Sequence, residues 1–375
     1  MRNGSPLRAL LIADGSGGHL IPALETAAEL ARGGARVQVW YAQRPKARGW
    51  AAALASELSA QGVTVAPIPV PQRARFLDRL WHGRRLWSRA ARQFAASAPD
   101  VVVGFGGWIS APVVLAARMR RIKCVIHEQN AVMGQANRWL ARWVDRVAVT
   151  FPASGGGRTV VMTGLPVRRQ IGTSSRAAAA APFGLDPSRP TLLVIGGSQG
   201  AHAVNRIVAE ALGRATSEER AGWQVVHLAG AADESTVRAA YAAAGISAVV
   251  APFLSQMADA YALADLVVSR AGASTIAELA RCGLPAILIP YPHAHGHQRE
   301  NARLVAAAGG GRVVEESSLA SALVLETIRR LLADAGLRDA MQGRMRALGV
   351  PDAAQRLSEA IVEVARAGHE PGARP

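Results

Sequence analysis

The 375-residue sequence has little cysteine, little lysine and no long apolar run. Its two cysteines, Cys124 and Cys282, lie far apart, which excludes a disulfide scaffold and suits the reducing cytoplasm. No segment approaches the roughly 20 apolar residues that a membrane-spanning helix requires. Near the N-terminus the apolar run 9–13 stops at Asp14 and is too short for the core of a signal peptide. We therefore expect a protein that is soluble or lies on a membrane surface without crossing it.

Positive charge is abundant and unevenly distributed. The 43 basic and 27 acidic residues give a formal net charge of +16. Residues 1–165 contain 22 basic and 8 acidic residues, a net charge of +14, whereas residues 166–375 are nearly neutral at +2. The first half is therefore expected to face an anionic partner, and composition alone leaves nucleic acid and a membrane surface open.

Short apolar runs alternate with glycine turns and helical segments along the chain. Runs typical of buried strands occur in the first half at 7–13, 37–41, 63–70, 100–104, 125–126 and 146–149. The pattern restarts at 191–195, 224–228, 248–251, 266–268 and 286–289. This alternation predicts an α/β fold of two doubly wound parallel sheets, joined near 164–166, with ligands at the carboxyl ends of the strands in a cleft between two domains.

Three glycine-rich loops follow predicted strands, at 15–18, 104–108 and 196–201. Glycine lets the backbone approach a ligand closely, and a following helix offers free N–H groups to a phosphate. The first loop lacks the G-x-G-x-x-G spacing of dinucleotide sites, and Asp14 places a negative charge beside it. A tight turn without a ligand is the alternative for the first loop. The second loop at the same sheet edge argues against that alternative, and the three loops together indicate a cleft with phosphate groups on both sides.

Two further segments carry polar residues directly after a strand. In 270–278, Thr275 and Glu278 fit a helix capping box, and Glu278 alternatively fits a carboxylate that binds ribose hydroxyls. Residues 127–130, His-Glu-Gln-Asn, indicate either a site or a satisfied turn. The histidines of 293–297 have no nearby cysteine and no HExxH spacing, and the sequence has no Asp-x-Asp pair. We therefore expect no metal site.

Segment 71–94 combines seven arginines with aromatic and aliphatic residues at helical spacing. The arginines are Arg73, Arg75, Arg79, Arg84, Arg85, Arg89 and Arg92. The pattern is typical of a helix that lies on an anionic membrane surface. A core-facing helix with a solvated arginine face is the alternative. Nucleic acid ranks lower, because no nucleic-acid-binding module accompanies the segment.

The motifs in their order along the chain resemble the MurG family of bacterial glycosyltransferases. The resemblance spans about residues 10–356 and rests on the segments 15–19, 104–108, 127–130, 164–168, 196–201, 270–278 and 297–302. It implies a GT-B architecture of two Rossmann-like domains, 1–165 and 166–349. It also implies a C-terminal helix within 350–375 that returns to the first domain.

The resemblance also implies a reaction and partners. Members of the family transfer N-acetylglucosamine from UDP-N-acetylglucosamine to the C4 hydroxyl of a lipid-linked N-acetylmuramyl-pentapeptide, with inversion and without metal or other cofactor. This reaction makes lipid II for peptidoglycan, and so serves cell shape and division. The first domain would face the acceptor and the cytoplasmic surface of the inner membrane, alongside other proteins of cell-wall synthesis. A transferase for another lipid and a non-catalytic nucleotide-binding scaffold remain alternatives.

Site residues follow from the resemblance position by position. Arg168 and Ser198 would hold the diphosphate, and Glu278 the ribose. Backbone near Leu254, with Phe253 and Met257, would frame the uracil. The start of a helix at Ala273, Ser274 and Thr275 would bind sugar and phosphate, and Gln298 and Asn130 would read the sugar hydroxyls. Contacts to the donor sugar and the acceptor are implied for Ser16, Gly17, Gly18, Gly104, Gly106, Gly107 and Trp108.

His19 is the candidate general base, because an unperturbed histidine titrates near neutral pH. Orienting the glycine loop is its alternative role. The sequence departs from the family pattern at Asp14, where glycine is usual, at Ser16, where threonine is usual, and at Leu165, where asparagine is usual. In the glutamine-rich segment His297 precedes Gln298, so only Gln298 carries over.

Overall fold

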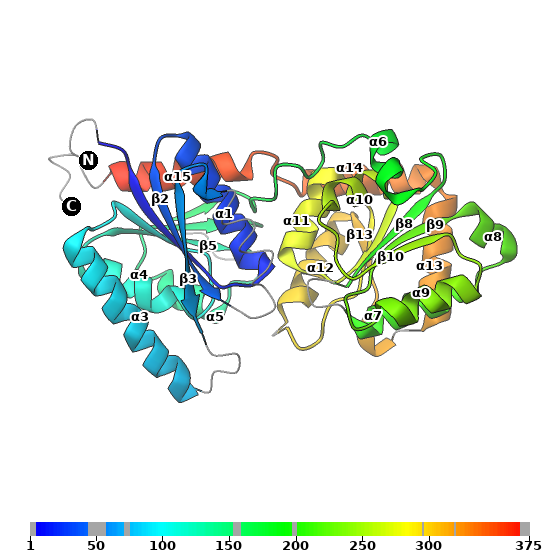
Figure 1. Ribbon diagram of the computed structural model, residues 1–375, viewed down its shortest axis with the longest axis horizontal. Coiled ribbons are helices and arrows are strands. Elements are labelled where there is room, and N and C mark those ends of the chain that lie inside the picture. Colours follow the sequence, from blue (N-terminus) through cyan, green and yellow to red (C-terminus); the bar gives the residue numbers. More distant parts are fainter. Residues whose placement is uncertain are drawn as a thin grey trace. The chain divides into compact units, whose positions relative to one another are not determined.

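The structure is a computed structural model that describes residues 5–43, 58–70, 76–152, 159–196, 201–294, 296–318 and 320–367. The chain divides into two compact units (Figure 1), which are Met1–Arg168 with Asp352–Pro375 (unit 1) and Arg169–Pro351 (unit 2). Three of the residues named above, Arg73, Arg75 and Ser198, lie outside the described residues.

Unit 1 contains a sheet of seven parallel strands in the order β3-β2-β1-β4-β5-β6-β7. The strands are β1 (Arg8–Ala13), β2 (Arg36–Gln43), β3 (Val63–Pro69), β4 (Val101–Gly104), β5 (Lys123–Glu128), β6 (Arg146–Val149) and β7 (Val160–Met162). The six strands predicted in this half are present. The sequence did not indicate the three-residue edge strand β7, whose side chains are partly exposed or exposed.

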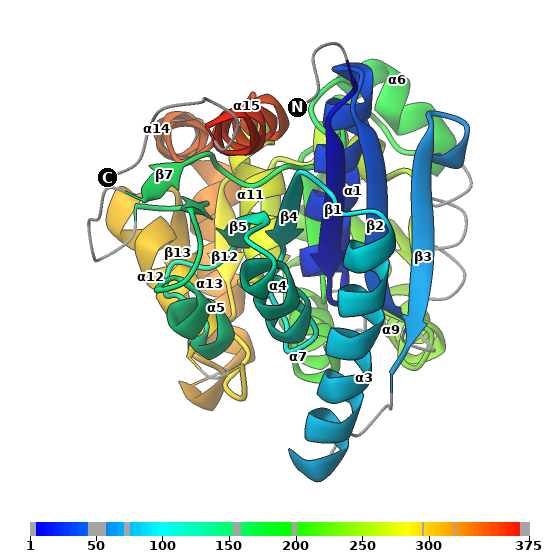
Figure 2. The ribbon, with the colours of Figure 1, turned by 90° about the vertical axis from the view of Figure 1, so that its left-hand side faces the viewer.

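Helices cover both faces of this sheet. They are α1 (Gly17–Arg32), α3 (Phe76–Ala96), α4 (Ser110–Met119), α5 (Gln135–Leu140) and α15 (Ala353–Arg366). Leu11 of β1 packs in a cluster with α1 and α15, and Ile12 packs in the opposite cluster with α3, α4 and α5. The arrangement is visible in Figures 1 and 2. Because neighbouring residues of a strand point to opposite faces, burial of both faces explains the unbroken apolar runs.

The last helix, α15, packs against unit 1 although it follows all of unit 2 in the sequence. Leu357 and Ile361 are fully buried in the cluster that contains α1. Both terminal nitrogens of Arg146, on β6, donate to the Glu363 carboxylate at 2.9 and 3.1 Å. A buried apolar stripe with one bidentate ion pair at its edge therefore fixes the helix on the sheet.

Unit 2 contains six parallel strands in the order β10-β9-β8-β11-β12-β13. The strands are β8 (Thr191–Ile195), β9 (Gln224–Leu228), β10 (Ala248–Ala251), β11 (Leu266–Ser269), β12 (Ala286–Leu288) and β13 (Gly311–Val313). The helices are α6 (Arg176–Ala180), α7 (His202–Gly213), α8 (Ser217–Gly222), α9 (Glu234–Ala243), α10 (Met257–Leu263), α11 (Ala273–Cys282), α12 (His297–Ala308), α13 (Ser321–Ala333) and α14 (Ala335–Ala347).

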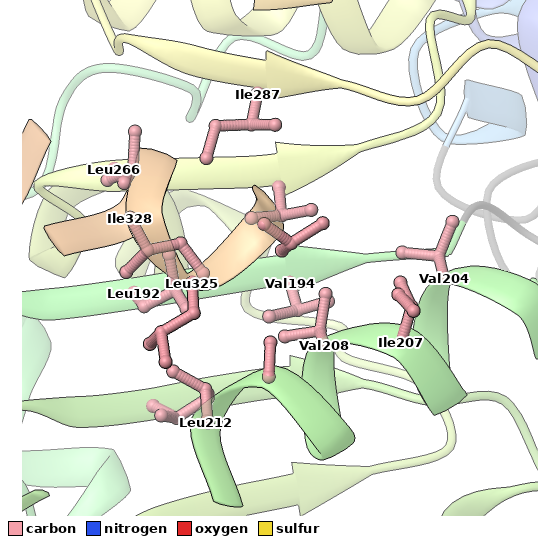
Figure 3. Close-up of a cluster of buried hydrophobic side chains, with 14 of the residues drawn as sticks. Leu192, Val194, Val204, Ile207, Val208, Leu212, Leu266, Ile287, Leu325 and Ile328 are labelled. Carbon is pink, nitrogen blue, oxygen red and sulfur yellow. The ribbon is translucent and has the colours of Figure 1, made fainter. Parts of the chain in front are cut away.

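The core of unit 2 joins β8 to helices α7 and α13. Leu192 and Val194 of β8 meet Val208 and Leu212 of α7 and Ile328 of α13 (Figure 3). On the opposite face of β8, Leu193 is also fully buried. The two parallel sheets with their covering helices confirm the predicted α/β architecture of two doubly wound, Rossmann-like domains, the GT-B fold class.

In both sheets the order of the strands reverses at the first strand. β1 lies between β2 and β4, and β8 lies between β9 and β11. In open α/β sheets, ligands bind outside the carboxyl ends of the strands at such a reversal. The fold therefore assigns ligands to the loops after β1 and β4 in unit 1, and after β8 and β11 in unit 2.

Arg281, at the end of α11, holds the two segments by which the chain enters and leaves unit 2. Its Nε donates to Ile171 O at 2.7 Å and its Nη1 to Pro351 O at 2.6 Å. One guanidinium group thus ties both ends of unit 2 together.

In the parts of the chain that the structure describes, no helix has both the length and the apolar character needed to cross a bilayer.

Candidate functional site

The loop after β1 places a histidine at the start of a helix. Ser16 precedes α1 with an extended backbone, and Ser16, Gly17, Gly18 and His19 are all partly exposed. The Ser16 hydroxyl does not cap the helix but lies 2.7 Å from His19 Nδ1. If Nδ1 carries the hydrogen and donates it to Ser16, His19 Nε2 is the nitrogen that accepts a proton. Ser16 and His19 therefore form a pair suited to general-base chemistry.

The loop after β4 packs directly against this pair. Gly106 and Gly107 have positive φ angles of 82° and 76°. A Cβ atom on Gly106 would lie 3.0 Å from His19 Cδ2, and one on Gly107 would lie 2.8 Å from the Cβ of Asp14. These glycines are required by backbone conformation and by close approach. The structure thus brings the first two glycine-rich loops together, as the order of strands predicts.

Gly104 and Trp108, which were also predicted as site residues of this loop, pack against core side chains. Gly104 is buried, and a Cβ atom there would touch Ile126, Ser110 and Val114 at 3.4 Å. Trp108 is partly buried and packs against the core cluster of α3, α4 and α5. These contacts account for both residues as supports of the loop, independently of any ligand.

Glu128 organises the loop that follows β5. It is 3% exposed, and its carboxylate accepts hydrogen bonds from Asn130 N at 3.0 Å, Asn130 Nδ2 at 3.1 Å, Gly134 N at 3.0 Å and Asn137 Nδ2 at 2.8 Å. Hydrogen bonds to a charged group are each worth about 1.5–3 kcal/mol. The carboxylate therefore fixes the position of Asn130. The sequence placed Glu128 beside the site without showing this role.

His127 is a buried structural histidine. Burial lowers its pKa to about 4, despite the opposing effects of the Gly164 carbonyl and Glu128, and nearby His19 lowers it further. Its Nε2 donates to Gly164 O at 2.9 Å, and its ring stacks on Phe105 with 5.6 Å between the ring centroids. His127 is therefore neutral at physiological pH and ties β5 to the loop that leads to Arg168. Arg168 itself is partly buried and is the last residue of this part of unit 1.

In unit 2 two helices begin beside the carboxyl ends of β11 and β12. Gly272 precedes α11, and Gly296, with φ 80°, precedes α12. Ser274 Oγ and His297 Nδ1, at these helix starts, are buried and have no hydrogen-bond partner among the described residues. The same holds for Ser269 Oγ, at the end of β11. Helix N-termini attract anions, and unpaired buried polar atoms are rare without a ligand or water.

The capping-box alternative for Glu278 is wrong. The residue before α11 is Gly272, which has no side chain, so Thr275 lies inside the first turn rather than at the cap. Glu278 is 7% exposed and accepts a hydrogen bond from the Tyr261 hydroxyl at 2.8 Å. Its carboxylate is therefore held on the second turn of α11, beside the helix start.

Other predicted residues of unit 2 lie at the start of α12, at the start of α10 and in the loop before α10. Gln298 Oε1 accepts a hydrogen bond from Tyr291 N at 2.9 Å, so the side-chain nitrogen of Gln298 points away from that backbone N–H. Phe253 is 61% exposed, Leu254 is partly buried, and Met257 is buried at the start of α10. α10 contacts both β8 and α11.

Arg270 is a nearly buried arginine that belongs to the 270–278 motif but that sequence reasoning did not single out. It is 8% exposed, donates from Nη1 to Ile289 O at 3.1 Å and forms an ion pair with Glu316. Its guanidinium carbon lies 5.3 Å from the centroid of the Tyr291 ring. The signal in the sequence for Arg270 was its position directly after a central strand.

In the described ranges, no group of three or more His, Cys, Asp or Glu side chains is arranged to hold a metal.

Helix α3 has one buried and one exposed apolar face. Leu86, Ala90 and Phe94 are at most 5% exposed, which confirms the core-facing alternative for this stripe. In contrast, Leu80 and Trp81 are about half exposed. Arg85 lies over the Trp81 ring, 3.7 Å from its centroid. The first turns of α3 extend past the sheet (Figures 1 and 2), and Leu80, Trp81 and Arg85 are exposed on this helix.

Comparisons with known proteins match almost the whole chain. Residues 9–149 match the glycosyltransferase family 28 N-terminal domain, and residues 191–357 match the family 28 C-terminal domain. A protein of Nocardioides named UDP-N-acetylglucosamine--N-acetylmuramyl-(pentapeptide) pyrophosphoryl-undecaprenol N-acetylglucosamine transferase is 40% identical, covering 96% of this chain and 98% of its own. The Acidothermus cellulolyticus protein of that name is 39% identical, with 96% and 99% covered. The crystal structure of Acinetobacter baumannii MurG has a TM-score of 0.76 at 28% identity, with 96% and 100% covered.

Two buried histidines predict how stability depends on pH. Burial lowers the pKa of His127 to about 4 and that of His227 to about 3. Below pH 6.5, the usual pKa of histidine, these two histidines bind protons in the unfolded chain but not in the folded chain. The free energy of unfolding therefore falls as pH decreases. We expect the thermal midpoint to drop between pH 7.5 and 5.5, and His227→Phe to show a smaller drop. The exposed His293→Phe is the control, and an unchanged pH dependence in His227→Phe would contradict the assignment.

Proposed function

The chain belongs to the MurG family, and we infer from this that it transfers N-acetylglucosamine from UDP-N-acetylglucosamine to the C4 hydroxyl of the lipid-linked muramyl-pentapeptide in peptidoglycan synthesis. The observation that carries the proposal is the start of α11 and α12 beside β11 and β12. The first turns of these two helices contain Ser274 and His297, and β11 ends at Ser269. Each of the three residues has a buried polar atom with no partner among the described residues. Such a site suits a ligand that has both charge and hydroxyl groups.

The donor contacts that we propose in unit 2 follow from this position. Ala273, Ser274 and Thr275 present N–H groups of the first turn of α11 to the sugar and phosphate. Glu278 accepts hydrogen bonds from the ribose, and Gln298 donates its amide to the sugar. Phe253, Leu254 and Met257 frame the uracil. Ser198 and Arg168 hold the diphosphate by analogy with the family.

The acceptor contacts that we propose lie at the edge of unit 1. The loops of Ser16 to Gly18 and of Gly104 to Trp108 seat the acceptor diphosphate and sugar, and Asn130 reads a sugar hydroxyl. Support comes from the close packing of His19 against Gly106 and from the four hydrogen bonds that fix the loop of Asn130 on Glu128.

The reaction that we propose is a single displacement. The C4 hydroxyl oxygen attacks the anomeric carbon, the bond from that carbon to the diphosphate oxygen breaks, and UDP leaves with the electron pair. The hydroxyl proton passes to His19 Nε2, while Nδ1–H donates to Ser16. Negative charge grows on the diphosphate, so helix N-termini stabilise the transition state more than the ground state.

Transfer of labelled N-acetylglucosamine to the lipid-linked muramyl-pentapeptide tests the proposal. We expect product with this acceptor and UDP-N-acetylglucosamine, without added metal. The Acinetobacter MurG serves as the positive control. Product only with a different lipid acceptor would assign a related transferase, and nucleotide binding without transfer would assign a scaffold.

His19→Ala tests the base. We expect kcat to fall by about 10²–10⁴ at saturating substrates, because proton transfer in the transition state is lost. Ser16→Ala should retain more activity, because the imidazole that takes the proton remains. Turnover near that of the wild-type protein in His19→Ala would leave His19 with the role of orienting the loop.

We further propose that unit 1 holds the protein on the cytoplasmic face of the membrane through α3. Basic residues near anionic lipid are worth about 1 kcal/mol each, so replacing Arg84, Arg85 and Arg92 with Gln should weaken binding to anionic vesicles about 100-fold. Added salt should weaken binding of the wild-type protein as well.

The matched control for this prediction changes three exposed arginines of unit 2, Arg206, Arg214 and Arg303, to Gln. Cosedimentation with phosphatidylglycerol vesicles, and with neutral vesicles for comparison, provides the measurement. Equal losses in the two triple variants would show that overall charge, not the α3 surface, governs binding. Binding that is insensitive to salt would assign the contact to apolar insertion of Leu80 and Trp81.

A further inference from the structure

A buried tyrosine contacts the carboxylate to which the ribose is assigned. Tyr261, on α10, is 2% exposed, and Glu278, on α11, is 7% exposed. The Tyr261 hydroxyl donates to Glu278 Oε2 at 2.8 Å. The two residues are 17 positions apart and lie on different helices, so the hydrogen bond joins two elements of the site.

Helix α10 also begins at Met257, one turn before Tyr261 on the same helix face. Met257 is one of the residues proposed to frame the uracil. A single short helix therefore supports the base through its first turn and reaches the ribose carboxylate through its second. α10 packs against α6 and contacts β8 and α11, which fixes its position in the unit.

We propose that Tyr261 is a positioning residue for the donor nucleotide. Its hydroxyl holds the Glu278 carboxylate in the rotamer that accepts hydrogen bonds from the 2′ and 3′ hydroxyls of the ribose. The proposal rests on the ribose role of Glu278 given above. A carboxylate has about four lone-pair positions, so the tyrosine occupies one and the ribose uses others.

Tyr261→Phe tests the proposal, because the ring continues to fill its buried position while the hydroxyl is lost. We expect the KM for UDP-N-acetylglucosamine and the Kd for UDP to rise about 5- to 50-fold, since a hydrogen bond to a charged group is removed. The change in kcat should stay within about twofold, because the hydroxyl does not act at the reacting atoms.

The decisive measurement compares UDP with 2′,3′-dideoxyuridine diphosphate. We expect Tyr261→Phe to weaken UDP but to leave the Kd of the dideoxy nucleotide close to that of the wild-type protein. The matched control is Tyr241→Phe, which removes another buried hydroxyl of unit 2, the one 2.8 Å from His227 Nδ1. A general loss of packing would weaken both nucleotides equally, and that result, like an unchanged UDP affinity, would overturn the proposal.

Glu278→Ala separates this inference from the proposed donor site. If Glu278→Ala weakens UDP but not the dideoxy nucleotide, the ribose role stands, and adding Tyr261→Phe should then cause little further loss. If Glu278→Ala weakens both equally or neither, the ribose role is wrong and the positioning role of Tyr261 falls with it. If only Glu278→Ala distinguishes the two nucleotides, the inference about Tyr261 alone is wrong.

Discussion

The constraint on which the site depends is the parallel sheet. In a parallel sheet every strand ends at the same edge, and both faces are buried under helices, so polar groups can gather only where strands end. Unit 1 uses the ends of β1, β4 and β5, which carry His19, the paired glycines and Glu128. Unit 2 uses the ends of β11 and β12, where α11 and α12 begin. The chemistry assigned to this chain therefore follows from where the strands stop.

Polar groups buried at such an edge must be satisfied from within the unit, and the way each is satisfied limits what it can do. Glu128 accepts four hydrogen bonds from the following loop and from α5, so it acts as an anchor rather than as a base. His127 is kept neutral by burial and donates to Gly164. His19 differs because it is partly exposed and its Nδ1 lies 2.7 Å from the Ser16 hydroxyl. Of these three side chains, only His19 is partly exposed, which supports its proposed role as the base.

The sequence predicted the parts of this arrangement that are local. Apolar runs located the long buried strands, and glycine turns located the loops, because both patterns are set by neighbouring residues. The edge strands β7 and β13 are short and partly exposed, so neither has the buried apolar run that marked the equally short β12. The roles of Glu128, Arg270 and Tyr261 depend on partners 9 to 46 positions away in other segments, such as the pairs Glu128–Asn137 and Arg270–Glu316. Thr275 and Glu278 have capping-box spacing, but α11 begins at Ala273, directly after Gly272, and spacing alone does not give this starting point.

Asp14 shows how a departure from the family pattern is accommodated. A carboxylate that faced the proposed acceptor site would repel a phosphate, yet Asp14 is 6% exposed and its Oδ2 lies beside Gly107. A Cβ atom at position 107 would come within 3.1 Å of that oxygen, so the aspartate requires glycine there, at a φ angle of 76° that glycine also favours. Positions 14 and 107 are therefore coupled by space, although 93 residues separate them. The side chain packs against the neighbouring loop, and Ser16 and His19 keep the accessible positions at the start of α1.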